Sequence, residues 1–146
     1  MSGSQVPPAS ERAREVVLST KTLIAIVDDD QGFRDALTSL IRSFGYRVRG
    51  FSSAPAFLAS PNIRNASCLI ADVQMSAMTG VELYSRLVES GHAIPTIIVT
   101  AYPDDGLRIR ALTGGVICYL SKPVDADELL ACIRAALGRA NPGEET

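Results

Sequence analysis

An apolar run that ends in a single carboxylate constrains the fold more than any other feature of this sequence. Residues 67–72 read Ser-Cys-Leu-Ile-Ala-Asp, without the polar alternation of a half-exposed strand. Turn residues then lead into a helical pattern that starts near Gly80. A buried strand followed by a helix is typical of a parallel α/β sheet, whose ligands bind beyond the carboxyl ends of the strands. The sequence therefore predicts that Asp72 lies at a ligand-binding edge.

Strand and helix patterns alternate along the rest of the chain. Right-handed crossovers keep such strands parallel and place helices on both faces, which predicts an α/β sandwich with the carboxyl ends of all strands on one edge. The expected strands are 23–27, 46–51, 67–72, 95–100 and 116–120, and the expected helices are 31–44, 53–59, 80–90, 104–112 and 125–137, the last closed by Gly138.

Chemically active side chains follow four of the expected strands. Asp28 and Asp29 come after the first, Asp72 ends the third, Thr100 ends the fourth, and Lys122 follows the fifth. Neighbouring carboxylates repel one another unless a cation joins them, and Mg²⁺ prefers oxygen ligands and is usually shared with a phosphate. A hydroxyl and an ammonium stabilise the oxygens of a transferring phosphoryl group. These side chains predict phosphoryl transfer in which Asp72 is the nucleophile.

The residues at these strand ends resemble the motifs of the receiver domain of bacterial two-component response regulators. The resemblance covers about residues 21–138, and the spacings between the motifs are most similar to those in receivers of LuxR-type transcription regulators. It implies a flavodoxin-like three-layer sandwich with a five-stranded parallel sheet in the order 2-1-3-4-5. The motifs that carry the resemblance are Val27-Asp28-Asp29-Asp30, Asp72-Val73-Gln74-Met75, Thr100-Ala101 and Lys122-Pro123.

By this resemblance, Asp72 is the phosphoacceptor, which receives a phosphoryl group from a sensor histidine kinase or a phosphotransfer protein. The side chains of Asp28, Asp29 and Asp72 and the backbone carbonyl of Gln74 would bind Mg²⁺, for which Mn²⁺ can substitute. The resemblance also implies a cis peptide bond before Pro123.

Thr100 and Lys122 would contact the phosphoryl group. A dianionic phosphoryl group should attract the hydroxyl of Thr100, and the space that Thr100 leaves should admit Tyr119, which occupies the position of the family's rotating aromatic residue. This movement would change the surface of the fourth helix, fifth strand and fifth helix, the expected face for a homodimer or a downstream protein. Gln74 and Tyr102 should flank the phosphoryl group and limit the access of water.

Recognition of the kinase is expected at the first helix and the loop after Lys122. Phe33, Leu37, Pro123 and Val124 are apolar side chains beside the predicted crevice, and exposed apolar groups there would suit a helical partner. The alternative is that Phe33 and Leu37 belong to the core.

Two other functions remain open. A phosphatase of the haloacid dehalogenase type has a similar nucleophile and Mg²⁺ site, but it needs a second aspartate two residues after the nucleophile, where this chain has Gln74. An interaction module could keep the fold and work without phosphorylation. The presence of all five functional groups favours the receiver, which is not an enzyme beyond promoting its own phosphorylation and dephosphorylation.

Composition bears on the partners and the compartment. The net charge of -2, without a long run of one sign, gives no electrostatic footprint for nucleic acid, and no apolar stretch approaches the length of a membrane helix. We therefore expect a cytoplasmic protein that binds neither nucleic acid nor membrane directly. Cys68, Cys118 and Cys132 lie in apolar runs without a C-x-x-C pairing, and we expect them to be buried thiols in a reducing compartment.

The domain boundaries follow from the same patterns. Residues 1–20 are rich in Ser, Pro and charge, and we expect them to be disordered or partly helical. Residues 21–138 form the expected receiver domain, and residues 139–146 form an expected flexible tail.

Overall fold

The computed structural model describes residues 22–61 and 65–140. The expected N-terminal extension and the part of the expected tail from residue 141 onward lie outside the described residues. Within the described ranges, no helix combines the length and the apolar character that crossing a membrane requires.

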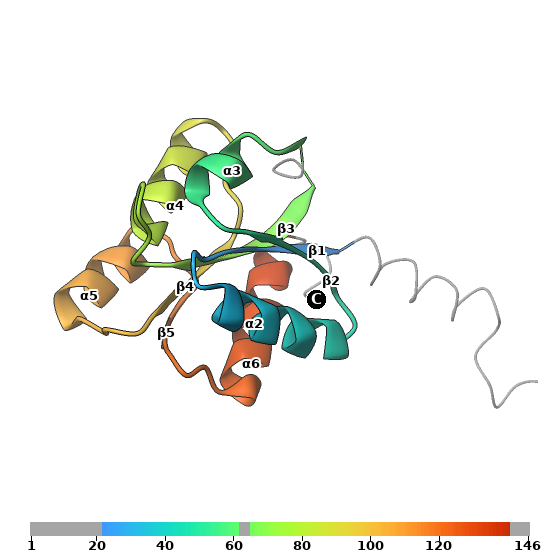
Figure 1. Cartoon of the computed structure of the whole chain (residues 1–146). Helices are drawn as coiled ribbons and strands as arrows, with labels where there is room; N and C mark the ends of the chain where they lie inside the picture. Colours follow the sequence, from blue (N-terminus) through green and yellow to red (C-terminus); the bar gives the residue numbers. More distant parts are fainter. Residues whose placement is uncertain (1–21, 62–64, 141–146) are drawn as a thin grey trace, which may run out of the picture.

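Five parallel strands form one sheet in the order β2-β1-β3-β4-β5, which confirms the predicted topology (Figure 1). β1 and β4 are buried along their whole length, in keeping with their unbroken apolar runs. At the edge, β2 alternates exposed Arg47 and Arg49 with buried Val48. The bounds are β1 Leu23–Val27, β2 Arg47–Phe51, β3 Ala66–Asp72, β4 Thr96–Thr100 and β5 Cys118–Ser121.

Helices cover both faces of the sheet, which gives the predicted three-layer sandwich (Figure 1). Leu37 and Ile41 of α2 pack with Leu129 and Ile133 of α6 on one face. The other face is covered by α3, α4 and α5, whose buried residues include Phe57, Leu83, Leu87 and Ala111. The bounds are α2 Gln31–Ser43, α3 Ala54–Leu58, α4 Gly80–Glu89, α5 Asp105–Thr113 and α6 Ala126–Ala140.

Side-chain caps fix the starts of the helices. The carboxylates of Asp30 and Asp104 accept hydrogen bonds from the third residue of α2 and α5. A capping box also starts α4, where Thr79 and Glu82 bond reciprocally to each other's backbone N–H groups. This box was not predicted from the sequence.

Two element bounds near the C-terminus differ from the prediction by two residues or more. The last strand begins at Cys118 rather than residue 116, because the N–H of Val116 bonds to the carbonyl of Ala111 at the end of α5. The last helix continues through Gly138 to Ala140. A glycine ends a helix by adopting a positive φ, and Gly138 is not among the positive-φ glycines.

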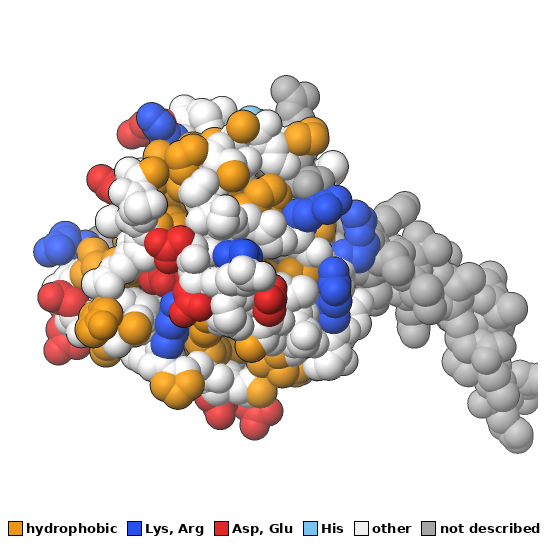
Figure 2. All heavy atoms as spheres, in the orientation of Figure 1, with side chains coloured by type: hydrophobic (Ala, Val, Ile, Leu, Met, Phe, Trp, Pro, Cys, Tyr) orange, Lys and Arg blue, Asp and Glu red, His pale blue; other side chains and the backbone are white. Residues whose placement is uncertain are grey.

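Basic side chains gather beside β2, away from the predicted site. Figure 2 shows this concentration of Lys and Arg on the side of the molecule where β2 lies. Arg42, Arg47 and Arg49 line a hollow of about 540 Å³ there. Leu23 and Arg47 begin β1 and β2 and also line it, so this hollow lies at the amino ends of the strands.

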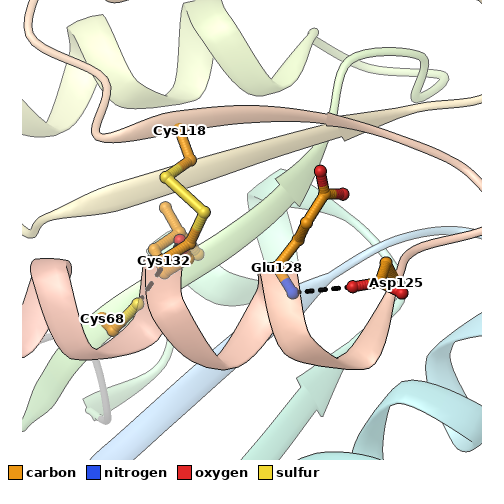
Figure 3. Close-up of a disulfide and its surroundings, with 6 residues drawn as sticks. Cys68, Cys118, Asp125, Glu128 and Cys132 are labelled. Carbon is orange, nitrogen blue, oxygen red and sulfur yellow. Dashed lines mark hydrogen bonds between the residues drawn. A yellow bond between two sulfur atoms is a disulfide. The ribbon is translucent and has the colours of Figure 1, made fainter.

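The expectation that all three cysteines are free thiols is wrong. Cys118 of β5 and Cys132 of α6 form a disulfide, with their Cα atoms 6.1 Å apart (Figure 3). This separation lies in the range that a disulfide spans. Both side chains pack on the same face of the sheet, an arrangement that their separation of 14 residues does not reveal in the sequence. Cys68 is free and fully buried.

Candidate functional site

The parallel sheet brings the predicted side chains together at one edge. Asp72 is the last residue of β3 and Thr100 is the last of β4, whereas Asp28 and Lys122 directly follow β1 and β5. The register pairs Val27 with Ala71 and Thr100 with Ser121, so these strand ends lie level with one another.

Lys122 joins two of the carboxylates. Its Nζ lies 2.9 Å from Oδ2 of Asp28 and 2.8 Å from Oδ2 of Asp72. The same ammonium lies 4.0 Å from the centre of the Phe33 ring, within the range of a cation–π contact. Asp28 and Asp72 are buried, and the Lys122 side chain is 14% exposed. Lys122 therefore neutralises acids that have little access to water.

The other oxygens of these acids bind backbone N–H groups. Oδ1 of Asp28 accepts from the N–H of Asp30, and Oδ1 of Asp72 accepts from the N–H of Gln74, each at 2.9 Å. The two turns thus hold both carboxylates with Oδ2 directed at Lys122.

Asp29 completes an acidic cluster. Its carboxylate, together with those of Asp28 and Asp72, offers three oxygens that all lie within 4.8 Å of one another. Asp29 is exposed, whereas the other two are buried. Three carboxylate oxygens from two adjacent strand ends are hard ligands of the kind that divalent Mg²⁺ prefers. The cluster therefore fits a hard divalent cation that keeps part of its hydration on the exposed side.

Burial and pairing shift two pKa values in the site. Burial raises the pKa of Asp28, and the charge of Asp72 adds to this shift, although hydrogen bonds from Asp30 and Lys122 oppose it. Burial of Lys122 opposes its charged form, but its hydrogen bonds to Asp72 and Asp28 outweigh that effect, so the pKa of Lys122 is raised. Lys122 is therefore a cation throughout the neutral range.

Thr100 has a buried hydroxyl beside the acidic cluster. The Thr100 Oγ1 accepts a hydrogen bond from the N–H of Tyr102 at 3.0 Å. A hydroxyl also has one donor hydrogen, so Thr100 can donate to a further oxygen while it keeps this bond. The Tyr102 side chain is 69% exposed, and Gln74 is also exposed.

Tyr119 already faces inward. Its ring packs against the core that α3, α4 and α5 cover, and its hydroxyl is buried without a hydrogen-bond partner among the described residues. The resemblance implied that Tyr119 moves inward when phosphorylation draws Thr100 away. The structure has the Tyr119 hydroxyl buried, which excludes a position of this hydroxyl at the surface.

The four residues expected to contact a kinase line one apolar groove. Phe33 and Val124 are half-buried and Pro123 is exposed, whereas Leu37 is 3% exposed and belongs to the core. Leu37 therefore forms the floor of the groove and is not an exposed contact, because the periodicity of α2 directs it at the sheet. The groove has a volume of about 220 Å³ and is completed by Ala36 and Leu40. The peptide bond between Lys122 and Pro123 is cis, as expected.

Two residues that position the ends of β1 and β3 were not predicted from the sequence. Arg34 of α2 donates from Nη1 to the backbone carbonyl of Asp28 at 2.6 Å, and the absence of a side chain at Gly50 makes room for the Arg34 stem. Gly80 starts α4 so close to β3 that a Cβ there would lie 2.5 Å from the backbone oxygen of Asp72. Neither contact has a local sequence signal, because each depends on how elements distant in the chain pack.

Known proteins similar to this chain point to one family. Residues 24–134 match the family model of the response regulator receiver domain. The chain is 39% identical over 132 residues to the response regulator protein TmoT of Ectopseudomonas mendocina, a match that covers 90% of this chain and 60% of TmoT. The chain therefore spans less than two thirds of the length of that relative.

Solved structures agree with this assignment. The structure of the response regulator StyR matches with a TM-score of 0.78 and 32% identity, over 86% of this chain and 64% of StyR. The crystal structure of FixJ-N matches with a TM-score of 0.72 and 32% identity, over 80% of this chain and 93% of FixJ-N.

Proposed function

This chain belongs to the response regulator receiver domain family, and from that premise we propose that Asp72 accepts a phosphoryl group from a sensor histidine kinase or a phosphotransfer protein. One observation carries the proposal: Lys122 bridges Asp28 and Asp72 in a buried site whose third acid, Asp29, faces water. This arrangement supports the proposal because a buried carboxylate, a fixed ammonium and a cluster of acidic oxygens lie within reach of one another.

Asp28, Asp29, Asp72 and the backbone carbonyl of Gln74 would hold Mg²⁺, or Mn²⁺ in its place. When bound, the ion supplies positive charge to the oxygens of the incoming phosphoryl group. An oxygen of Asp72 then bonds to phosphorus as the phosphorus–nitrogen bond of the donor's phosphohistidine breaks and its electron pair returns to the imidazole. Lys122 and the Thr100 hydroxyl donate to the phosphoryl oxygens, where charge develops.

Two surfaces would serve the partners. The groove of Phe33, Leu37, Pro123 and Val124 adjoins Lys122 and would receive the donor protein. The surface of α5, β5 and α6 would bind a second copy of the chain or a downstream protein, with Thr100 and Tyr119 as the link to Asp72 and with Gln74 and Tyr102 limiting water at the phosphoryl group.

We further propose that residues 21–138 act in the cytoplasm as a receiver of the LuxR-type regulator class, without direct contact to nucleic acid or membrane. Catalysis would be limited to the chain's own phosphorylation and dephosphorylation. Gln74 stands where a dehalogenase-type phosphatase needs an acid, and an amide cannot transfer that proton.

One observation favours a second function. Because the Tyr119 hydroxyl is already buried, the chain could present its α5, β5 and α6 surface without phosphorylation, as an interaction module.

A single labelling experiment tests the proposal. Incubation with acetyl phosphate and Mg²⁺ should add the mass of one phosphoryl group, and Asp72→Asn should remove the label because an amide cannot attack phosphorus. Asp35→Asn, which changes an exposed acid of α2, is the matched control and should be labelled like the wild type. An unlabelled wild-type chain would favour the interaction module, and a labelled Asp72→Asn chain would move the nucleophile to Asp28 or Asp29.

A further inference from the structure

The disulfide ties the last strand of the sheet to the last helix (Figure 3). β5 has four residues and lies at the edge of the sheet, where among the described strands it pairs with β4 on one side only. Cys118 and Cys132 both pack into the core that α6 covers. The disulfide therefore adds a covalent restraint to a short edge strand.

The two bonded cysteines differ in accessibility from the third. Cys118 is half-buried and Cys132 is 8% exposed, whereas Cys68 is fully buried. Burial raises the pKa of the Cys68 thiol to about 12, so Cys68 stays protonated and unreactive. A small oxidant therefore meets Cys118 before either of the other two.

The segment closed by the disulfide contains parts of the site already described. Between Cys118 and Cys132 lie Tyr119, whose hydroxyl is buried and unpaired, and Lys122, which contacts both Asp28 and Asp72. Among the described residues, the Tyr119 hydroxyl has no hydrogen-bond partner, and its ring is held by packing against the core that α3, α4 and α5 cover. Fixing Cys118 fixes the backbone from which Tyr119 projects.

We propose that Cys118 and Cys132 are a redox modification site that exchanges with small-molecule disulfides and thiols, and that its oxidised form restrains the response of the α5, β5 and α6 surface to phosphorylation. The restraint rests on the proposed function of Asp72, whereas the exchange chemistry does not. The oxidised pair links two of the three elements of that surface. The reduced pair lacks this covalent link between Cys118 of β5 and Cys132 of α6.

The exchange proceeds in two balanced steps. The Cys118 thiolate attacks one sulfur of oxidised glutathione, forms a mixed disulfide and releases one glutathione thiolate. The Cys132 thiolate then attacks the Cys118 sulfur of that mixed disulfide and releases the second glutathione thiolate. The two protein sulfurs are oxidised, oxidised glutathione is reduced, and the two protons from the protein thiols end on two glutathione molecules.

Counting thiols tests the chemistry. The full chain is reduced, equilibrated with either reduced or oxidised glutathione, unfolded and alkylated, and its mass is measured. We expect three alkylated cysteines after reduced glutathione and one, Cys68, after oxidised glutathione. Three alkylated cysteines under both conditions would overturn the site.

The response to a phosphoryl mimic tests the restraint. Amide chemical shifts of β5 and α6 are recorded with and without Mg²⁺ and beryllofluoride for the reduced and the oxidised chain. We expect the shift changes to be lost or strongly reduced on oxidation, in the wild type and in Cys68→Ala. In Cys118→Ala, and separately in Cys132→Ala, the oxidant should have no effect on them.

The outcomes separate the two proposals. Equal shift changes in the reduced and oxidised wild type would overturn the restraint and leave the role of Asp72 standing. Absence of a response in both redox states, in the wild type and all three variants, would overturn the proposed function and with it the restraint. A response that oxidation abolishes in Cys118→Ala as well would assign the effect to another residue.

Discussion

Replacing Gly80 with alanine should destabilise the fold next to the phosphoacceptor strand. A Cβ at Gly80 would lie 2.5 Å from the backbone oxygen of Asp72 and 3.1 Å from Cδ1 of Ile98. A backbone oxygen at the end of a buried strand cannot turn away as a flexible side chain can. The start of α4 must therefore move away from the end of β3.

The expected cost follows from two opposing contributions. Overpacking of this kind costs about 1–3 kcal/mol, and the higher helix propensity of alanine returns at most about 1 kcal/mol of it. The free energy of unfolding should fall by about 1–2 kcal/mol, which is roughly a 5- to 30-fold change in the folding equilibrium. With a urea dependence of about 2 kcal/mol per molar, the middle of the usual range for small proteins, the unfolding midpoint should fall by roughly 0.5–1 M.

Urea unfolding followed by circular dichroism measures this difference. Gly32→Ala in α2 is the matched control, because a Cβ there meets only the Asp30 carboxylate, at an ordinary contact distance of 3.5 Å. Its midpoint should be unchanged or higher than that of the wild type. A Gly80→Ala chain as stable as Gly32→Ala would refute the inference that α4 rests on the carbonyl of Asp72.

Three other predictions concern the site, the groove and the disulfide. Lys122→Ala should bind Mg²⁺ at least as tightly as the wild type, since it removes a cation that competes for the acids. The variant should not show the change in amide chemical shifts on addition of beryllofluoride. Weaker Mg²⁺ binding in calorimetry would contradict the role proposed for Lys122. Ala36→Glu places a charge in the groove and should slow phosphoryl transfer from a phosphohistidine protein but not from acetyl phosphate. The control Ala56→Glu, at an exposed position of α3, should slow neither, and equal slowing of Ala36→Glu with both donors would exclude a docking role. The disulfide joins two cysteines 14 residues apart in the sequence, so its reduction should lower the free energy of unfolding by about 3 kcal/mol. Coincident urea midpoints for the oxidised and reduced chains would contradict this stabilisation.

The sheet and the positions of its reactive groups were predictable from sequence because both follow from backbone rules. Unbroken apolar runs such as Leu23–Val27 identify buried parallel strands, and parallel strands end on one edge. Those two rules place Asp28, Asp72 and Thr100 on the same edge of the sheet, and the strand order that the resemblance implies makes their strands neighbours.

The features that the sequence did not reveal depend on packing between distant elements. The helical periodicity places Phe33 and Leu37 on one stripe, but only the seating of α2 on the sheet decides that Leu37 is core and Phe33 lies at the rim. The pairing of Cys118 with Cys132 requires α6 to lie over β5. The inward position of Tyr119 is a side-chain rotamer, which neither strand periodicity nor spacing determines.

A carboxylate in water has two equivalent oxygens, but the fold makes those of Asp72 different. One is fixed by the backbone N–H of Gln74, and the other faces Lys122. Rotation of the group would break both bonds at once, so the same oxygen meets an incoming reagent each time. The end of β3 thus makes the two oxygens of this carboxylate chemically distinct. The acyl phosphate that we propose would form on one defined oxygen.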